Sequence, residues 1–193
     1  MATRTPSADP RAERVRAKLI DAAFALAHER PVDQLTVGDL VARAGVSRQV
    51  FYRHFADRDD AVATAFVIAF AAATADLDGE PRSRILRIFG LAAEHRAMYR
   101  NVVPSPVAQR VVAAFRGELL PACEDLAARA VVGAAAGLEP GAVSRFLVGG
   151  FQEVLRSWME DPGESGHAAD LLGRVTAALD TVDALLSRLD VTT

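Results

Sequence analysis

Residues 36–58 impose the tightest constraint on what this chain can fold into: they read TVGDLVARAGVSRQVFYRHFADR. Thr36 has a hydroxyl that can cap a helix, and Asp39, three residues later, can complete a capping box with it. Gly45 follows one helical segment at the position where a left-handed residue ends a helix at little cost. Ser47 can cap the next segment. The stretch therefore predicts two short helices joined by a tight turn.

The second of these helices, expected over residues 48–55, carries side chains that proteins use to read DNA. An α-helix fits the major groove of B-DNA, where Arg48 can pair with guanine and Gln49 with adenine. Three more polar side chains crowd a helix too short to bury many of them: Tyr52, Arg53 and His54. A solvated helical hairpin is the simpler interpretation. The ordered combination of cap, turn and Tyr-x-His-Phe nevertheless favours a helix-turn-helix that binds double-stranded DNA.

The charge distribution supports a DNA contact in the N-terminal part of the chain. The whole chain has a net charge of −3, which by itself argues against a nucleic-acid-binding protein. Residues 1–58, however, contain ten basic and seven acidic residues, whereas the remainder contains 12 basic and 18 acidic residues. Such a basic N-terminal part followed by an acidic remainder is expected when only the N-terminal part contacts phosphate.

The rest of the chain is expected to be helical, so the predicted fold class is all-α. Apolar side chains recur at steps of three and four residues, and no segment alternates as a β-strand would. With the two short helices this gives about nine helices, the others being expected over residues 11–28, 58–76, 82–96, 97–102, 107–129, 141–160 and 167–189. Pro121 is expected to kink or interrupt the helix that contains it.

Composition sets limits on location and on cofactors. The single cysteine, Cys123, excludes an internal disulfide and fits a reducing compartment, and no Cys/His cluster has the spacing of metal ligands. Residues 1–14 contain no apolar signal core, and the longest uncharged run, residues 61–75, is shorter than the ~20 residues of a membrane span. We therefore expect a cytoplasmic protein with no metal, no cofactor and no membrane partner. A buried Cys123 is expected, with a redox-sensing thiol as the alternative.

The last two expected helices carry more apolar surface than one neighbouring helix needs. The final segment has a narrow apolar seam, suited to helix-on-helix packing, that contains Leu172, Val175, Leu179, Val182 and Leu186. Gly149 and Gly150 lie in the middle of the preceding helix, where they would let another backbone approach closely. These features predict a subunit interface in a homodimer. Packing within one subunit is the alternative.

The segment LIDAAFALAHERPVDQLTVGDLVARAGVSRQVFYRHFADRDDAVATAF resembles the N-terminal domain of the TetR/AcrR family of transcriptional regulators. The resemblance covers about residues 12–66. It implies three DNA-binding helices, a connecting fourth helix and a larger helical domain for ligand binding and dimerisation. The implied division is a flexible tail over residues 1–10, a helix-turn-helix domain over residues 11–57, and a ligand-binding and dimerisation domain over residues 58–193.

The resemblance also implies roles for individual residues in the N-terminal domain. Three residues at the start of the second short helix are expected to read bases and the nearby backbone: Ser47, Arg48 and Gln49. Four residues are expected to hold phosphates: Thr36, Tyr52, His54 and Arg58. Arg58 stands where the family usually has Lys. Arg53 stands where a second aromatic residue is frequent, and we expect it to add a base or phosphate contact.

A ligand pocket in the larger domain is a further implication of the resemblance. The candidates to line it, each aromatic one having core packing as its alternative, are Phe66, Phe70, Phe89, His95, Met98, Tyr99, Phe115, Phe151, Gln152 and Trp158. Ligand binding would spread the two DNA-reading heads of a homodimer and release a palindromic operator. The expected function is therefore a repressor that a small apolar or amphipathic molecule releases from DNA.

Two alternatives stay open at this point. The same fold can act without a small-molecule inducer, either through a protein partner or constitutively. The chain can also be a helical enzyme or carrier with an incidental hairpin, but no nucleophile lies near a histidine in a recognisable motif, and no paired carboxylates or Gly-rich phosphate loop are present.

Overall fold

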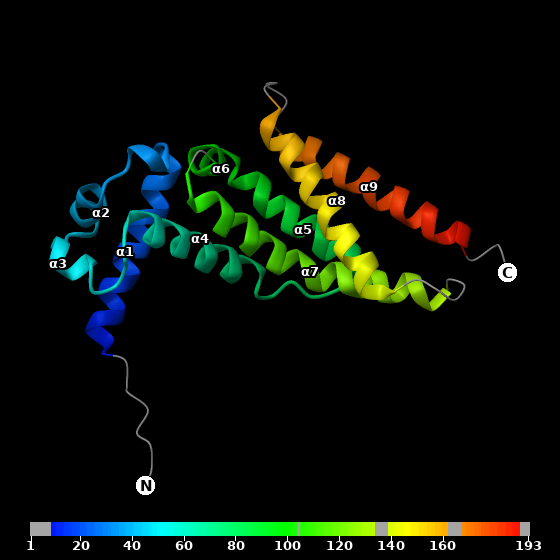
Figure 1. Cartoon of the computed structure of the whole chain (residues 1–193), viewed down its shortest axis with the longest axis horizontal. Helices are drawn as coiled ribbons and strands as arrows, with labels where there is room; N and C mark the ends of the chain where they lie inside the picture. Colours follow the sequence, from blue (N-terminus) through cyan, green and yellow to red (C-terminus); the bar gives the residue numbers. More distant parts are fainter. Residues whose placement is uncertain (1–8, 104, 134–138, 162–166, 190–193) are drawn as a thin grey trace, which may run out of the picture. The chain divides into compact units, whose positions relative to one another are not determined.

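The computed structural model describes residues 9–103, 105–133, 139–161 and 167–189, and every regular element in these ranges is a helix. Nine α-helices and one short 3-10 turn make up this described part of the chain (Figure 1). The all-α prediction is confirmed. The helices group into two compact units, which are taken one at a time below.

Unit 1 comprises residues 1–69 and 97–111. Its described elements are α1 (Pro10–Glu29), the 3-10 turn η1 (Val32–Gln34), α2 (Val37–Ala44), α3 (Arg48–Phe51), the first part of α4 (Arg58–Thr74), most of α6 (Arg96–Val102) and the start of α7 (Val107–Gly133). The fully buried side chains at its centre include Leu19, Leu40, Phe51, Val62 and Met98. Because burial of one such side chain contributes about 1.5–3 kcal/mol, this core holds α2 and α3 firmly in place.

Local signals define the ends of α1 as the sequence predicts. Asp9 caps its first turn by accepting a hydrogen bond from the backbone N–H of Arg11, and Pro10 occupies the first helical position. The helix ends at Glu29 because the following residue is already extended and Pro31 cannot continue a helix. From α6, the Asn101 side-chain amide donates to the carbonyl oxygen of Ala27 at 2.9 Å, which satisfies one of the last carbonyls of α1.

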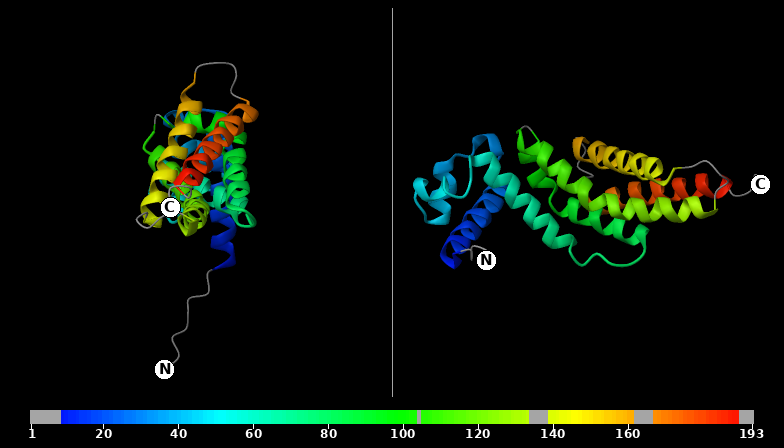
Figure 2. Two further views of the ribbon diagram at one scale, coloured as in Figure 1. Left: turned by 90° about the vertical axis from the view of Figure 1, so that its right-hand side faces the viewer. Right: turned by 60° about the horizontal axis from the view of Figure 1, so that its bottom comes forward.

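Unit 2 comprises residues 70–96 and 112–193. Its described elements are the rest of α4 and α7, together with α5 (Pro81–Glu94), α8 (Pro140–Glu160) and α9 (Ala168–Leu189). In this unit α9 packs against α5 and α8, as can be followed in Figure 1 and Figure 2. The buried side chains of the unit include Ile85, Phe89, Leu119, Trp158, Leu171 and Leu179.

Two of the expected helices differ in detail from the structure. The helix expected over residues 48–55 is α-helical only to Phe51, because the backbone N–H groups of Arg53 and His54 bond to carbonyls three residues back and tighten the chain into a turn. Helix α7 continues through Pro121 to Gly133, so this proline does not interrupt the helix, and the predicted kink stays a prediction.

The two compact units do not follow the functional division expected from the sequence. Residues 58–69 and 97–111 group with the N-terminal helices, although the expected boundary of the DNA-binding domain lies at residue 57. That boundary concerns function, so it stays a prediction. Most of the expected tail, residues 1–8, lies outside the described part of the chain. Among the described residues, no helix combines the length and apolarity needed to cross a membrane.

Candidate nucleic-acid interface

The first turn of α2 is closed by the capping box that the sequence predicts. The Thr36 hydroxyl accepts a hydrogen bond from the backbone N–H of Asp39 at 3.1 Å, and the Asp39 carboxylate accepts one from the backbone N–H of Thr36 at 2.8 Å. The hydroxyl also donates to this carboxylate at 2.7 Å. The box fixes an exposed hydroxyl and the start of α2 in one geometry.

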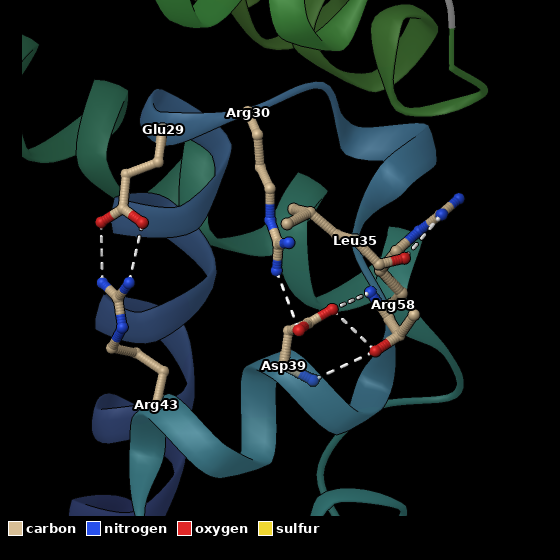
Figure 3. A network of polar contacts seen from close by, with 7 residues as sticks. Glu29, Arg30, Leu35, Asp39, Arg43 and Arg58 are labelled. Atoms are coloured by element: carbon tan, nitrogen blue, oxygen red, sulfur yellow. Dashed lines mark hydrogen bonds and ion pairs between the residues drawn. The ribbon is translucent and has the colours of Figure 1, made fainter.

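Two arginine–carboxylate pairs hold α2 against the end of α1 (Figure 3). Nη2 of Arg30 lies 2.9 Å from Oδ1 of Asp39. Arg43 forms a bidentate pair with Glu29, in which Nη1 donates to Oε1 at 2.8 Å and Nη2 donates to Oε2 at 2.7 Å. The hydrogen bond from the Thr36 hydroxyl, followed by that from Arg30, lowers the pKa of Asp39 from 3.8 to about 2. Sequence patterns did not predict these pairs, because their partners belong to different elements.

The turn between α2 and α3 has the geometry that its residues predict. Gly45 is left-handed, with φ 67° and ψ 38°, and Val46 donates its backbone N–H to the Val41 carbonyl at 3.0 Å. The Ser47 hydroxyl then accepts from the backbone N–H of Val50 at 3.3 Å and caps α3. The turn and its two caps together fix the direction in which α3 leaves α2.

α3 has one buried anchor and several exposed polar side chains. Phe51 is fully buried and packs edge-on against the ring of Tyr52, which is itself 60% exposed. His54 is half-buried in the turn that follows. The remaining predicted DNA-contacting residues on α3 and this turn are exposed: Arg48, Gln49 and Arg53. The side chains that α3 and this turn offer to a ligand are therefore cationic, amide and phenolic groups, on a helix that Phe51 anchors in the core.

Gly38 brings two of the predicted residues together, although sequence reasoning did not single it out. A Cβ atom on Gly38 would stand 3.0 Å from Nη2 of Arg48 and 3.2 Å from Oγ1 of Thr36. The Arg48 guanidinium therefore lies over the first turn of α2, close to the capping hydroxyl. A glycine in the first turn of a short helix, where better helix formers are available, was the signal that could have identified it.

Arg58 does not share this exposed surface. Its side chain is only 23% exposed, and the guanidinium lies against the Asp59 carboxylate. It also donates to the backbone carbonyl of Leu35, as Figure 3 shows. The predicted phosphate contact of this residue thus has no support from the geometry. The reason is the carboxylate of the next residue, which engages the guanidinium at 2.7 Å.

The predicted ligand-binding residues fall into separate groups. Phe66 and Met98 belong to the core of unit 1, so their role in ligand binding stays a prediction: Met98 is fully buried there, and Phe66 packs against that core and against Phe24. A chain of ring contacts in unit 2 joins four of the others: Phe70, Phe115, Phe89 and Phe151. Trp158 is buried beneath the Arg96 guanidinium, which lies 4.6 Å from its ring. The three remaining residues predicted to line a ligand pocket are half-buried: His95, Tyr99 and Gln152.

Two of the residues predicted for the subunit interface are used inside the subunit. Val175 and Leu179 are buried in unit 2, so they have no surface left for a partner, and their assignment is corrected. Leu172 and Val182 are half-buried, and the side chain of Leu186 lies outside the described part of the structure. Gly149 and Gly150 are exposed on α8, and their close approach to another helix stays a prediction. Leu185 is exposed at 58%, and so, at 77%, is Phe146, which the sequence reasoning missed.

Among the described residues, no group of three or more His, Cys, Asp or Glu side chains is arranged to hold a metal ion. The Cys123 thiol is fully buried, and desolvation raises its pKa to about 12, which favours the unreactive protonated form. The structure therefore supports the buried-residue interpretation of Cys123 over the redox-sensing one.

Comparison with known proteins bears directly on the helix-turn-helix. The family model described as bacterial regulatory proteins of the tetR family matches residues 19–63, which include all of α2 and α3. Proteins from two strains of Mycobacterium tuberculosis, each described as an uncharacterized HTH-type transcriptional regulator, are 30% identical over 149 residues. The match covers 66% of this chain and 61% of each relative, so the chain spans about three fifths of their length.

Solved structures of similar proteins share the whole fold. The fatty acid degradation regulator FadR from Bacillus halodurans superposes with a TM-score of 0.62 at 15% identity, over 92% of this chain and 97% of that one. A TetR transcriptional regulator from Streptococcus agalactiae gives a TM-score of 0.60 at 18% identity, over 86% and 94%. At these identities the likeness concerns the fold alone. The family model places the helix-turn-helix of this chain among the bacterial regulatory proteins of the tetR family, and the described chain shares the fold of solved TetR-family regulators.

Proposed function

We propose that this protein is a sequence-specific DNA-binding transcriptional regulator in which the start of α3 reads bases in the major groove. The observation that carries the proposal is the contrast between Phe51, fully buried, and Arg48 and Gln49, exposed on the same short helix. A buried anchor limits the motion of α3, so these two side chains present fixed hydrogen-bonding groups. Arg pairs with guanine and Gln with adenine in the major groove.

Phosphate contacts around α3 would set its position on the duplex. Tyr52 and Arg53 are exposed beside the base-reading residues, His54 is half-buried, and the Thr36 hydroxyl lies at the start of α2. Contacts of this kind fix register and orientation without reading sequence. Their loss is expected to weaken binding to all DNA, whereas loss of Arg48 or Gln49 relaxes the preference for particular bases.

A homodimer would place two such helices on one operator. Unit 2 exposes Phe146 and the glycines Gly149 and Gly150 on α8, and Leu185 on α9. Exposed apolar side chains beside glycines that admit a close backbone suit helix-on-helix contact between subunits. A twofold dimer reads a palindromic site whose half-sites are about one helical turn apart, roughly 34–36 Å.

The regulatory proposal is that the dimer is a repressor that a small apolar or amphipathic molecule releases. Within unit 2, the ring chain from Phe70 to Phe151 supplies apolar surface. The indole N–H of Trp158 is buried and has no acceptor among the described residues. Buried donors are nearly always paired, so an acceptor on a bound molecule would satisfy it. A DNA-binding regulator of this kind acts in the cytoplasm and performs no catalysis.

The experiment that tests DNA binding is capture of genomic DNA fragments by the purified protein, followed by sequencing. The proposal expects a few enriched fragments that share a palindromic motif, and loss of this enrichment for the variant with Arg48→Ala and Gln49→Ala. Equal recovery of all fragments by the wild-type protein would contradict it. The genes beside the enriched fragments would indicate the class of effector to test.

The effector proposal has a separate test. Native mass spectrometry of the purified protein should show an added small-molecule mass, which Trp158→Phe reduces because the indole donor is removed. A co-purifying protein in place of a small molecule would support the partner-controlled alternative and contradict release by a ligand.

A further inference from the structure

The first residue of α4 is held by the protein itself. The Nη1 atom of Arg58 donates to the carbonyl oxygens of Leu35, at 3.0 Å, and of Asp33, at 3.3 Å. The Nε atom donates to the Asp59 carboxylate at 2.7 Å, and Nη2 lies 2.7 Å from the same carboxylate oxygen. Every nitrogen of this guanidinium thus has an acceptor within unit 1.

These contacts leave Arg58 poorly suited to bind phosphate. The Asp59 carboxylate offsets the positive charge of the guanidinium, and the side chain is less than a quarter exposed. A phosphate oxygen would have to compete with an ion pair and two carbonyl hydrogen bonds that are already formed. Buried or half-buried charged hydrogen bonds of this kind are the strong ones, so the exchange offers little gain.

The carbonyls that Arg58 holds lie directly before α2. Leu35 precedes Thr36, and the Thr36 hydroxyl closes the capping box with Asp39. At its other end α4 continues beyond Ala69 into unit 2, so one helix belongs to both compact units. The Arg58 side chain therefore joins the start of this shared helix to the segment that sets the start of α2.

We propose that Arg58 is a positioning residue that fixes the segment 33–36, and through it Thr36 and α2, instead of a residue that grips DNA. The proposal rests on the proposed DNA binding for its effect on affinity, but its structural part stands without DNA. A shift of the first turn of α4 would pull on the two carbonyls and move the phosphate-facing start of α2. The phosphate contacts would then come from exposed groups such as Arg53.

The salt dependence of DNA binding separates the two roles of Arg58. Each lost phosphate contact changes the slope of log K against log salt by roughly 0.9. Arg58→Gln should weaken binding about tenfold without changing this slope, because it displaces α2 but removes no phosphate contact. Arg53→Gln, an exposed arginine of the same unit, is the matched control and should lower the slope. A slope change of about 0.9 for Arg58→Gln would overturn the proposal.

Amide hydrogen exchange in the DNA-free protein gives a readout that does not depend on the proposed function. Arg58→Gln should speed exchange about tenfold at Thr36, Asp39 and Leu40, with no comparable change at the buried amides of α1, and Arg53→Gln should leave both regions unchanged. Arg58→Lys should recover part of the protection, because an ammonium group can still donate to the carbonyls. Unchanged exchange at Thr36–Leu40 in Arg58→Gln would refute the positioning role, even if the wild-type protein bound no DNA.

Discussion

The guanidinium of Arg48 lies over Gly38, 3.0 Å from the point where a Cβ atom on that glycine would stand. The contact joins the first turn of α2 to the first residue of α3, across the turn of the helix-turn-helix. The resting position of Arg48, the side chain proposed to read bases, therefore depends on the absence of a side chain at position 38. Gly38 is therefore a determinant of how Arg48 is presented, although it has no group that could touch DNA.

Replacing Gly38 by Ala should alter DNA recognition more than stability. The new methyl group displaces the flexible end of Arg48 and presses on the Thr36 hydroxyl, 3.2 Å away, while alanine favours the helix by up to ~1 kcal/mol. We expect an unchanged or slightly raised melting temperature and an altered base preference. Gly90→Ala, in a helix where the new Cβ meets nothing within 4 Å, is the control and should leave DNA binding as it is. An unchanged preference in Gly38→Ala would show that the resting position of Arg48 is irrelevant.

The capping box should make stability depend on acid through Asp39. The folded-state pKa of about 2 lies below the ordinary aspartate value of 3.8, so Asp39 stabilises the fold above pH 3.8 and loses this contribution as the pH falls towards 2. Asp39→Asn should therefore lower the melting temperature at neutral pH and differ less from the wild type at about pH 2. Asp21→Asn, on the exposed face of α1, serves as the control. A gap between wild type and Asp39→Asn that stays constant down to pH 2 would disprove this role.

Cys123 should be inert in the folded protein. Its thiol is fully buried, and desolvation raises its pKa to about 12, so neither access nor ionisation favours attack. A thiol-specific chromogenic reagent at about pH 8 should label the chain only after unfolding in guanidinium chloride. Rapid labelling of the native protein would revive a redox role for this residue.

The exposed apolar residues of unit 2 should control the oligomeric state. Phe146→Glu or Leu185→Glu places a charge on α8 or α9 where the monomer offers no burial. We expect each variant to sediment as a monomer with unchanged helix content by circular dichroism. Val67→Glu, an exposed apolar position on α4, should leave the dimer intact. A dimer that persists in both α8 and α9 variants would exclude this face as the interface.

Substitution within the buried seam should give a different result. Leu179 is 1% exposed, so Leu179→Glu buries an unpaired charge and should unfold unit 2 before it affects assembly. The sequence predicted that this seam forms a subunit interface, with packing within one subunit as the alternative, and Val175 and Leu179 follow the alternative. The seam pattern could not decide between the two, because the same spacing serves packing within a subunit and between subunits.

The parts of the site that sequence predicted are those whose causes act within a few residues. The box of Thr36 and Asp39, the left-handed Gly45 and the Ser47 cap each depend on contacts spanning three or four positions. The contacts of Arg58 with Leu35 and Asp33 were not predicted, because these residues lie 23 and 25 positions earlier in the chain. No local pattern records such a contact.

The aromatic residues predicted to bind a ligand could not be assigned to one compact unit from the sequence, for a similar reason. Aromatic residues at helical spacing are expected in any helical core, so sequence could not separate Phe66, which packs in unit 1, from Phe70, four residues on, which stacks on Phe115 in unit 2. The division depends on where α4 leaves one compact unit and enters the other.

Selection of bound sequences from a random duplex library tests the central claim, that Arg48 and Gln49 read bases from the start of α3, most directly. The wild-type protein should enrich a palindromic motif, and Arg48→Ala should lose preference at one position of each half-site, a discrimination worth about 1–3 kcal/mol for a bidentate pair. Tyr52→Ala should bind the same motif more weakly. The claim is contradicted if the wild type enriches no motif, or if Arg48→Ala and Gln49→Ala both enrich the motif unchanged.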